Sequence, residues 1–137
     1  MGNIESIPLV NYEDVQLFLK NPNHYILLNT FDISHQECLI LNTLKAQDEE
    51  EKMNYYLNNN KSINIIIYGR NSNDSTTYNK YNQLHKLGFK YIYIYPGGLF
   101  EWLLLQDIYG NDDFPITKKE LDILKYKPKR QIAGLLT

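Results

Sequence analysis

The sequence predicts an α/β fold, a central, mostly parallel five-stranded sheet with helices on both faces. Apolar runs of strand length alternate along the chain with segments of helical periodicity, and short polar loops join them. Several of these runs are continuously apolar, which is typical of parallel strands covered on both faces. The 137 residues fit one domain with a real core, and right-handed crossovers leave few topologies.

The strands are expected at the apolar runs. The run at 63–68 is the most β-branched and is predicted to be the central strand. The run at 7–10 is a short entry strand. In chain order, the predicted strands are 7–10, 25–31, 38–44, 63–68 and 91–95.

The helices are expected where an apolar stripe follows a capping signal. Gly88 is placed to end one of them in the left-handed conformation. The predicted helices are about 12–20, 46–57, 75–87, 100–108 and 117–124. The predicted capping boxes pair Asn11 with Asp14, Asp48 with Glu51, and Thr117 with Glu120. The third helix is expected to turn Tyr78, Tyr81, Leu84 and Leu87 toward the core.

The stretch 63–102 contains the most specific pattern. A buried strand leads into a short polar loop, a helix, a second strand, Gly97-Gly98 and Trp102. This order resembles the second half of a rhodanese-like domain, and the resemblance covers roughly residues 7–108. In that family the strand ends in a cysteine, an anion-cradling loop follows, and a GG-x-x-x-W element closes the unit. The resemblance implies the same α/β fold.

The loop after the strand departs from the family pattern at its reactive residue. YGRNSNDS stands where the family has Tyr/Phe-Cys-Arg-x-Gly-x-Arg-Ser, so Gly69 takes the cysteine position. Glycine has no side chain to hold a sulfur or a phosphate, and Asp74 stands where the family often has a basic residue. No catalytic residue is therefore predicted in the loop Gly69, Arg70, Asn71, Ser72, Asn73, Asp74 and Ser75. Either the loop is an inert turn or its backbone still binds a small anion.

The first half of the family pattern is also altered. The family has Asp-Val-Arg after its second strand, and Asn29 and Phe31 take the places of the Asp and the Arg. The single cysteine, Cys38, excludes an internal disulfide and a cysteine-based metal cluster. It is expected to be buried and structural, with a displaced nucleophile as the alternative.

Composition excludes several other functions. The net charge of −2 gives no general nucleic-acid footprint. No segment reaches the length of a membrane span, and no signal-peptide core follows Met1. His24, His35 and His85 lack metal-site spacing, so no metal or cofactor is predicted. The free cysteine favours a reducing, cytoplasmic location, and the heavy use of Asn, Ile, Lys and Tyr is typical of an AT-rich genome such as that of a protist or a large DNA virus.

Both termini carry signals for a membrane surface. Met1–Ser6 matches the myristoylation motif, with Gly2 as the acceptor. One myristoyl chain binds membranes only marginally, and the basic tail at 125–130 would supply the second signal. A peripheral membrane or virion location would follow. The alternative is a chance match and an ordinary solvated tail.

The sequence therefore predicts an N-terminal extension at 1–6, a rhodanese-like domain at 7–110, and a C-terminal helical appendage with a basic tail at 111–137. The predicted function is a catalytically inactive domain that binds an unknown protein partner as an interaction or scaffold module. The alternative is a residual sulfurtransferase or phosphatase-type enzyme with a non-standard loop.

Overall fold

The computed structural model describes residues 6–132, so Gly2 lies outside the described residues and its acylation stays a prediction. Helices and strands alternate along the chain. The elements are α1 (Tyr12–Lys20), η1 (Pro22–His24), β1 (Tyr25–Asn29), η2 (Ile33–His35), β2 (Thr43–Leu44), α2 (Ala46–Asn59), β3 (Asn64–Tyr68), α3 (Thr76–Leu87), β4 (Tyr91–Tyr95), α4 (Gly98–Tyr109) and η3 (Ile123–Tyr126).

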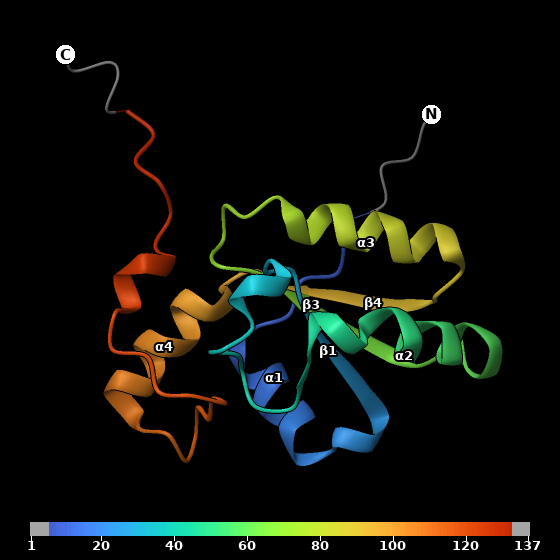
Figure 1. The fold of residues 1–137 in the computed structure, drawn as a ribbon, viewed down its shortest axis with the longest axis horizontal. Coiled ribbons are helices and arrows are strands. Elements are labelled where there is room, and N and C mark those ends of the chain that lie inside the picture. Colours follow the sequence, from blue (N-terminus) through green and yellow to red (C-terminus); the bar gives the residue numbers. More distant parts are fainter. Residues whose placement is uncertain (1–5, 133–137) are drawn as a thin grey trace.

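The four strands form one parallel sheet in the order β2-β1-β3-β4. Figure 1 shows α3 on one side of the strands and α1 and α4 on the other. The core clusters agree, because α1 and α4 pack on one face and α2 and α3 on the other. The predicted α/β fold, with a parallel sheet covered on both faces, is confirmed.

The position of β3 inside the sheet explains why its sequence is continuously apolar. Ile66 and Tyr68 face the α1/α4 side, whereas Ile65 and Ile67 face the α2/α3 side. Because successive side chains of a strand point to opposite faces, both sets must be apolar when both faces are covered. All four side chains are at most 2% exposed.

Within residues 6–132, the sheet has four strands rather than the predicted five. The run at 7–10 forms only an isolated parallel bridge from Leu9 to Ile94, with Val10 N–H donating to Ile94 O at 2.8 Å. Pro8 lacks an N–H, which limits a regular ladder at this edge. The run therefore covers part of the β4 edge without becoming a strand.

The predicted strand at 38–44 is wrong except for Thr43 and Leu44. The backbone N–H of Leu39 donates to the Thr117 hydroxyl at 3.0 Å, so the preceding residues satisfy their backbone outside the sheet. Asn42 adopts a left-handed φ of 66°, which breaks an extended chain. Burial produced the apolar run here, not strand pairing.

One of the three predicted capping boxes forms, that of Asn11 and Asp14. The Asp48–Glu51 box is wrong because α2 begins at Ala46, as the helix predicted at 46–57 does, and the Ala46 N–H donates to the Gln36 side chain at 2.9 Å. Asp48 therefore lies inside the first turn.

The predicted helix at 117–124 is also wrong. The Thr117 hydroxyl donates to Glu37 O and accepts from Leu39 N–H, so it caps no helix. Only the short turn η3 forms, at Ile123–Tyr126.

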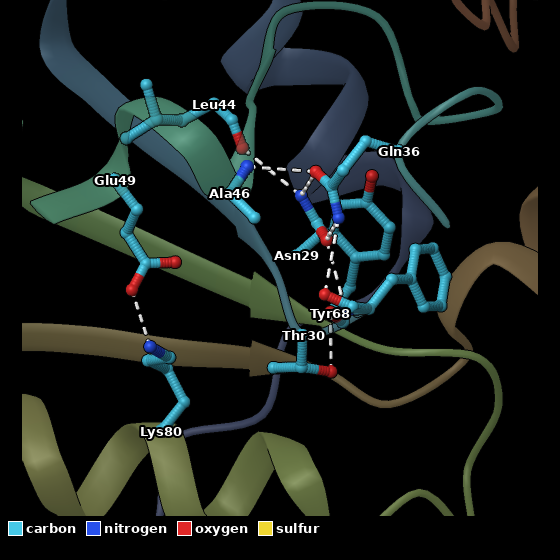
Figure 2. A network of polar contacts seen from close by, with 9 residues as sticks. Asn29, Thr30, Gln36, Leu44, Ala46, Glu49, Tyr68 and Lys80 are labelled. Carbon is cyan, nitrogen blue, oxygen red and sulfur yellow. Dashed lines mark hydrogen bonds and ion pairs between the residues drawn. The ribbon is translucent and has the colours of Figure 1, made fainter. Parts of the chain in front are cut away.

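The helix α3 buries part of the predicted face. Gly88 ends it in the left-handed conformation as expected, with φ 105°. Thr77 and Leu84 are buried, while Tyr78 and Leu87 are exposed by 38% and 45%. Tyr81 packs against the core, so Tyr81 and Leu84 face it as predicted, while Tyr78 and Leu87 do not. An ion pair between Lys80 of α3 and Glu49 of α2 spans this side of the molecule (Figure 2).

The segment after α4 contributes to the main core. Phe114 and Tyr126 are 3% and 7% exposed and belong to the cluster on the α1/α4 face. Ile116 pairs with Ile40 in an antiparallel bridge, and Trp102 Nε1–H donates to Pro115 O at 3.1 Å. A domain boundary at residue 110 stays a prediction. No helix in the described chain is long and apolar enough to cross a membrane.

Candidate functional site

The predicted loop lies at the carboxyl end of β3 and leads into the N-terminus of α3. Gly69 is buried, and three other loop residues are exposed, namely Ser72, Asn73 and Ser75. The ends of β1 and β4 meet at the same edge because the sheet is parallel. Parallel α/β sheets generally build their sites at this edge.

The N-terminus of α4 holds the first part of the loop. Leu99 N–H donates to Gly69 O at 3.0 Å, and Phe100 N–H donates to Arg70 O at 2.9 Å. Gly98 makes this approach possible, since its φ is +64° and a Cβ there would lie 2.6 Å from Gly69 O. The Gly97-Gly98 element therefore acts structurally, by fixing the carbonyls at the start of the loop.

The Asp74 carboxylate fills the space beside Gly69. Its Oδ2 accepts from Arg70 N–H at 2.9 Å, and its Oδ1 accepts from Thr76 N–H at 3.0 Å. A Cβ at Gly69 would lie 2.9 Å from Asp74 Cγ and 2.9 Å from Thr30 Oγ1, closer than real Cβ contacts allow. The loop thus carries its own anion, and the side chains of Asp74 and Thr30 close the space around Gly69.

The only cation of the loop is directed toward the C-terminal segment. Arg70 Nη2 donates to Lys125 O, and the guanidinium lies 5.1 Å from the centre of the Tyr126 ring. Asn71 Nδ2 donates to Tyr126 O at 2.8 Å. The Tyr126 ring packs 6.0 Å from Phe31, centroid to centroid. Arg70 therefore attaches the segment near η3 to the loop instead of facing the space beside Gly69.

Two side-chain amides pair at the end of β1, where the family pattern has an aspartate. Asn29 and Gln36 are both buried, and each amide donates to the other at 2.9 Å (Figure 2). Asn29 also donates to Leu44 O and accepts from Phe31 N–H. Asn29 consequently ties down the chain after β1 through hydrogen bonds that a neutral amide can make and an ionised carboxylate cannot.

Cys38 lies beside a small cavity of about 220 Å³ that His35 and Tyr126 also line. The thiol is buried, and desolvation together with the charge of Glu120 raises its pKa to about 11. A nucleophilic thiol needs the opposite shift. Cys38 is therefore buried, as predicted, and its surroundings disfavour the thiolate.

Two buried tyrosines have structural hydroxyls. Tyr68 accepts from Ile40 N–H at 3.1 Å and lies 2.8 Å from the Thr43 hydroxyl, and burial raises its pKa. Tyr95 donates to Glu101 at 2.6 Å, and burial again raises the pKa of the phenol. Within residues 6–132, no group of three or more His, Cys, Asp or Glu residues is placed to hold a metal ion.

Sequence reasoning missed the residues that complete the site. Thr30, Lys125 and Tyr126 reach the loop from other segments of the chain, and Thr76 follows it directly at the start of α3. Their contacts span up to 55 residues, and no local motif marks them.

The comparisons identify the family. The family model described as the rhodanese-like domain matches residues 26–105. The chain belongs to the rhodanese-like family. No curated protein matches this rhodanese-like chain by sequence.

Solved structures share the fold at low sequence identity. A rhodanese-like domain from Anabaena is 20% identical, with a TM-score of 0.56, over 73% of this chain and 76% of that one. A yeast protein tyrosine phosphatase of the rhodanese family is 14% identical, with a TM-score of 0.59, over 88% and 99%. A thiosulfate sulfurtransferase from Pseudomonas aeruginosa is 15% identical, with a TM-score of 0.58, over 72% of this chain and 19% of that one. At these identities the similarity shows the fold alone.

Proposed function

We propose that this rhodanese-like domain is catalytically inactive and acts by binding another protein, as an interaction or scaffold module. The observation that supports the proposal best is the content of the loop. Gly69 offers no nucleophile, and the Asp74 carboxylate already accepts the N–H groups of Arg70 and Thr76.

Electrostatics strengthen this argument. A sulfane donor such as thiosulfate, or a phosphate ester, brings negative charge into the loop. That charge would have to displace the Asp74 carboxylate from two N–H donors or lie beside it, and like charges at such distances repel. Arg70 would not offset the repulsion in the space beside Gly69, because its guanidinium is directed toward Lys125 and Tyr126 of the C-terminal segment.

The alternative, an enzyme that uses Cys38, is disfavoured by the state of the thiol. With a pKa of about 11, roughly one thiol in ten thousand is ionised at neutral pH. The residue is 6% exposed, which also restricts the approach of a substrate.

The outer side of α4 offers a surface for a partner. Leu104, Ile108 and Tyr109 are exposed by 39%, 69% and 64%. Leu104 and Ile108 lie one helical turn apart and therefore share a face. Large apolar side chains that stand together on a surface are typical of interaction sites.

The test is a pair of activity assays on the full chain. Thiosulfate–cyanide sulfur transfer and p-nitrophenyl phosphate hydrolysis are measured beside an active thiosulfate sulfurtransferase as the positive control. We expect no turnover above buffer for the unmodified protein or for Cys38→Ser. Turnover that disappears in Cys38→Ser would establish the alternative enzyme, and turnover that persists would implicate the loop. Either result would refute the proposal.

A further inference from the structure

A groove of about 850 Å³ runs between the loop and the segment that follows η3. Its charged lining consists of four cations and two carboxylates, namely Arg70, Lys125, Lys127, Lys129, Asp74 and Asp122. The chain as a whole carries a net charge of −2. Positive charge is therefore concentrated in this groove against the overall balance of the protein.

The lysines of the groove alternate with anchored residues. Lys125, Lys127 and Lys129 line the groove, whereas Tyr126 between them is buried and Pro128 is half-buried. The backbone is extended at Lys127, with φ −64° and ψ 153°. These angles are those of polyproline II, in which residues 127 and 129 lie roughly 6 Å apart along the chain, and the side chains of both lysines line the groove.

Contacts on either side of Lys127 reduce the conformational entropy that the lysine-bearing segment would lose when it binds a partner. Tyr126 packs against Phe31 and Arg70, and its carbonyl accepts from Asn71. Pro128 restricts the backbone beside it. A row of amines held in this way loses less freedom on binding than a free tail would.

Most of the positive charge lacks a carboxylate partner. Lys125 pairs with Glu120 at 3.0 Å. Among residues 6–132, Lys127 and Lys129 form no ion pair, and Arg70 contacts a carbonyl and a ring rather than an acid. Of the two carboxylates, Asp74 is already engaged by the loop N–H groups.

We propose that this groove binds an extended acidic segment of a partner protein, whose carboxylates at alternate positions meet Lys127 and Lys129, with Arg70 beside them. The inference rests on the proposed function, since it names the kind of partner that the module takes. Leu124, exposed by 60%, lines the same groove and offers an apolar contact to an intervening side chain of the peptide.

The chemistry of the groove favours a peptide over a nucleic acid or a lipid surface. No aromatic side chain is among the residues that line it, whereas single-stranded nucleic acids are held by stacking on aromatic rings. The lysines line a concave groove, which an extended peptide can enter and a flat anionic leaflet cannot.

The experiment measures fluorescence anisotropy of a labelled peptide that alternates glutamate and valine, with a peptide that alternates glutamine and valine as the uncharged probe. The full chain is compared with the double variant Lys127→Glu/Lys129→Glu. The matched control is Lys86→Glu/Lys90→Glu, which makes the same change in net charge on exposed residues. Lys86 lies in the last turn of α3, roughly 15 Å along the helix from Thr76, and Lys90 lies just beyond the helix.

We expect the glutamate peptide to bind the unmodified protein and to bind more weakly as salt is added. Affinity should fall about tenfold or more in the groove variant and by less than about twofold in the control. Absence of binding, an equal loss in both variants, or equal binding of the glutamine peptide would overturn the inference. So would tighter binding of a single-stranded oligonucleotide or of phosphatidylserine vesicles.

The same preparations are tested for sulfur transfer and phosphatase activity. A chain that neither binds the peptide nor turns over substrate overturns only the groove. Turnover overturns the proposed inactivity, whatever the peptide does.

Discussion

Replacing Gly69 by cysteine is expected to destabilise the fold by about 2 kcal/mol. The backbone itself tolerates the change, because Gly69 is not among the glycines with positive φ. The new Cβ would lie 2.9 Å from Asp74 Cγ, so the carboxylate must rotate away. It then loses the N–H groups of Arg70 and Thr76, each worth about 1 kcal/mol at a half-exposed site.

A double-mutant cycle with Asp74→Ala isolates this conflict. That substitution alone removes the same two backbone N–H bonds, together with the one from the Thr76 hydroxyl, whose other partner is Thr30, and should also cost about 2 kcal/mol. Adding Gly69→Cys in that background should then cost little, apart from the contact with Thr30 Oγ1, which is present in both backgrounds and cancels. The coupling energy is therefore expected to be about 2 kcal/mol.

Urea denaturation followed by tryptophan fluorescence measures these free energies. Trp102 is the only tryptophan and is fully buried, so it reports on global unfolding. Unchanged m-values confirm that only stability has changed. Ser72→Cys, on an exposed loop residue, is the matched control and should stay within about 0.5 kcal/mol. Additive costs at Gly69 and Asp74 would refute the idea that the carboxylate occupies this space.

Four further outcomes are expected. Gly98→Ala should cost about 3 kcal/mol or more, since its φ is +64° and a Cβ would meet the backbone of the loop. Gly88→Ala, with a left-handed φ of +105° and only the Lys61 side chain nearby at 3.6 Å, should cost about 1 kcal/mol in the same denaturation assay; equal costs would contradict the close approach. Burial raises the pKa of Cys38 from 9.0 to about 11, so the contribution of the protonated thiol to the free energy of unfolding is complete below pH 9 and is lost toward pH 11. The stability advantage of the unmodified protein over Cys38→Ala should therefore shrink by about 2 to 3 kcal/mol between pH 9 and pH 11, as measured by denaturation. Asn29→Asp should cost about 2 to 4 kcal/mol at pH 7 and less at pH 5, because a buried carboxylate would face two acceptor oxygens that the amide now satisfies; a pH-independent cost would argue against this. If Gly2 is myristoylated, protein isolated from its natural source should have an intact mass that lacks Met1 and includes one myristoyl group. An unmodified mass would refute the predicted acylation.

The capping and periodicity patterns of the sequence correctly predicted those helices and strands that depend on residues close together in the chain. The Asn11–Asp14 capping box, the end of α3 at Gly88 and the strands β1, β3 and β4 all form. These features depend on hydrogen bonds and periodicities within a few residues of chain. The resemblance then placed Gly69 at the end of the central strand, where the structure has it.

The failures have a common cause in long-range contacts. The apolar run at 38–44 is buried, but Leu39 bonds to Thr117, 78 residues away, instead of joining the sheet as a strand. The same contact removes Thr117 from its predicted cap. A buried apolar run has the same composition in a loop as in a strand, so periodicity does not separate the two.

By itself, the sequence determined that this chain forms a parallel α/β fold, because strands buried on both faces are continuously apolar. It also determined that the loop has no cysteine, because residue 69 is a glycine. Only the tertiary structure decided what fills the loop and what surrounds it. Asp74 turns inward because two backbone N–H groups converge on it, and Arg70 turns outward because the carbonyl of Lys125 meets it from 55 residues along the chain. Such partners are chosen by packing, which brings together polar groups that no spacing in the sequence relates.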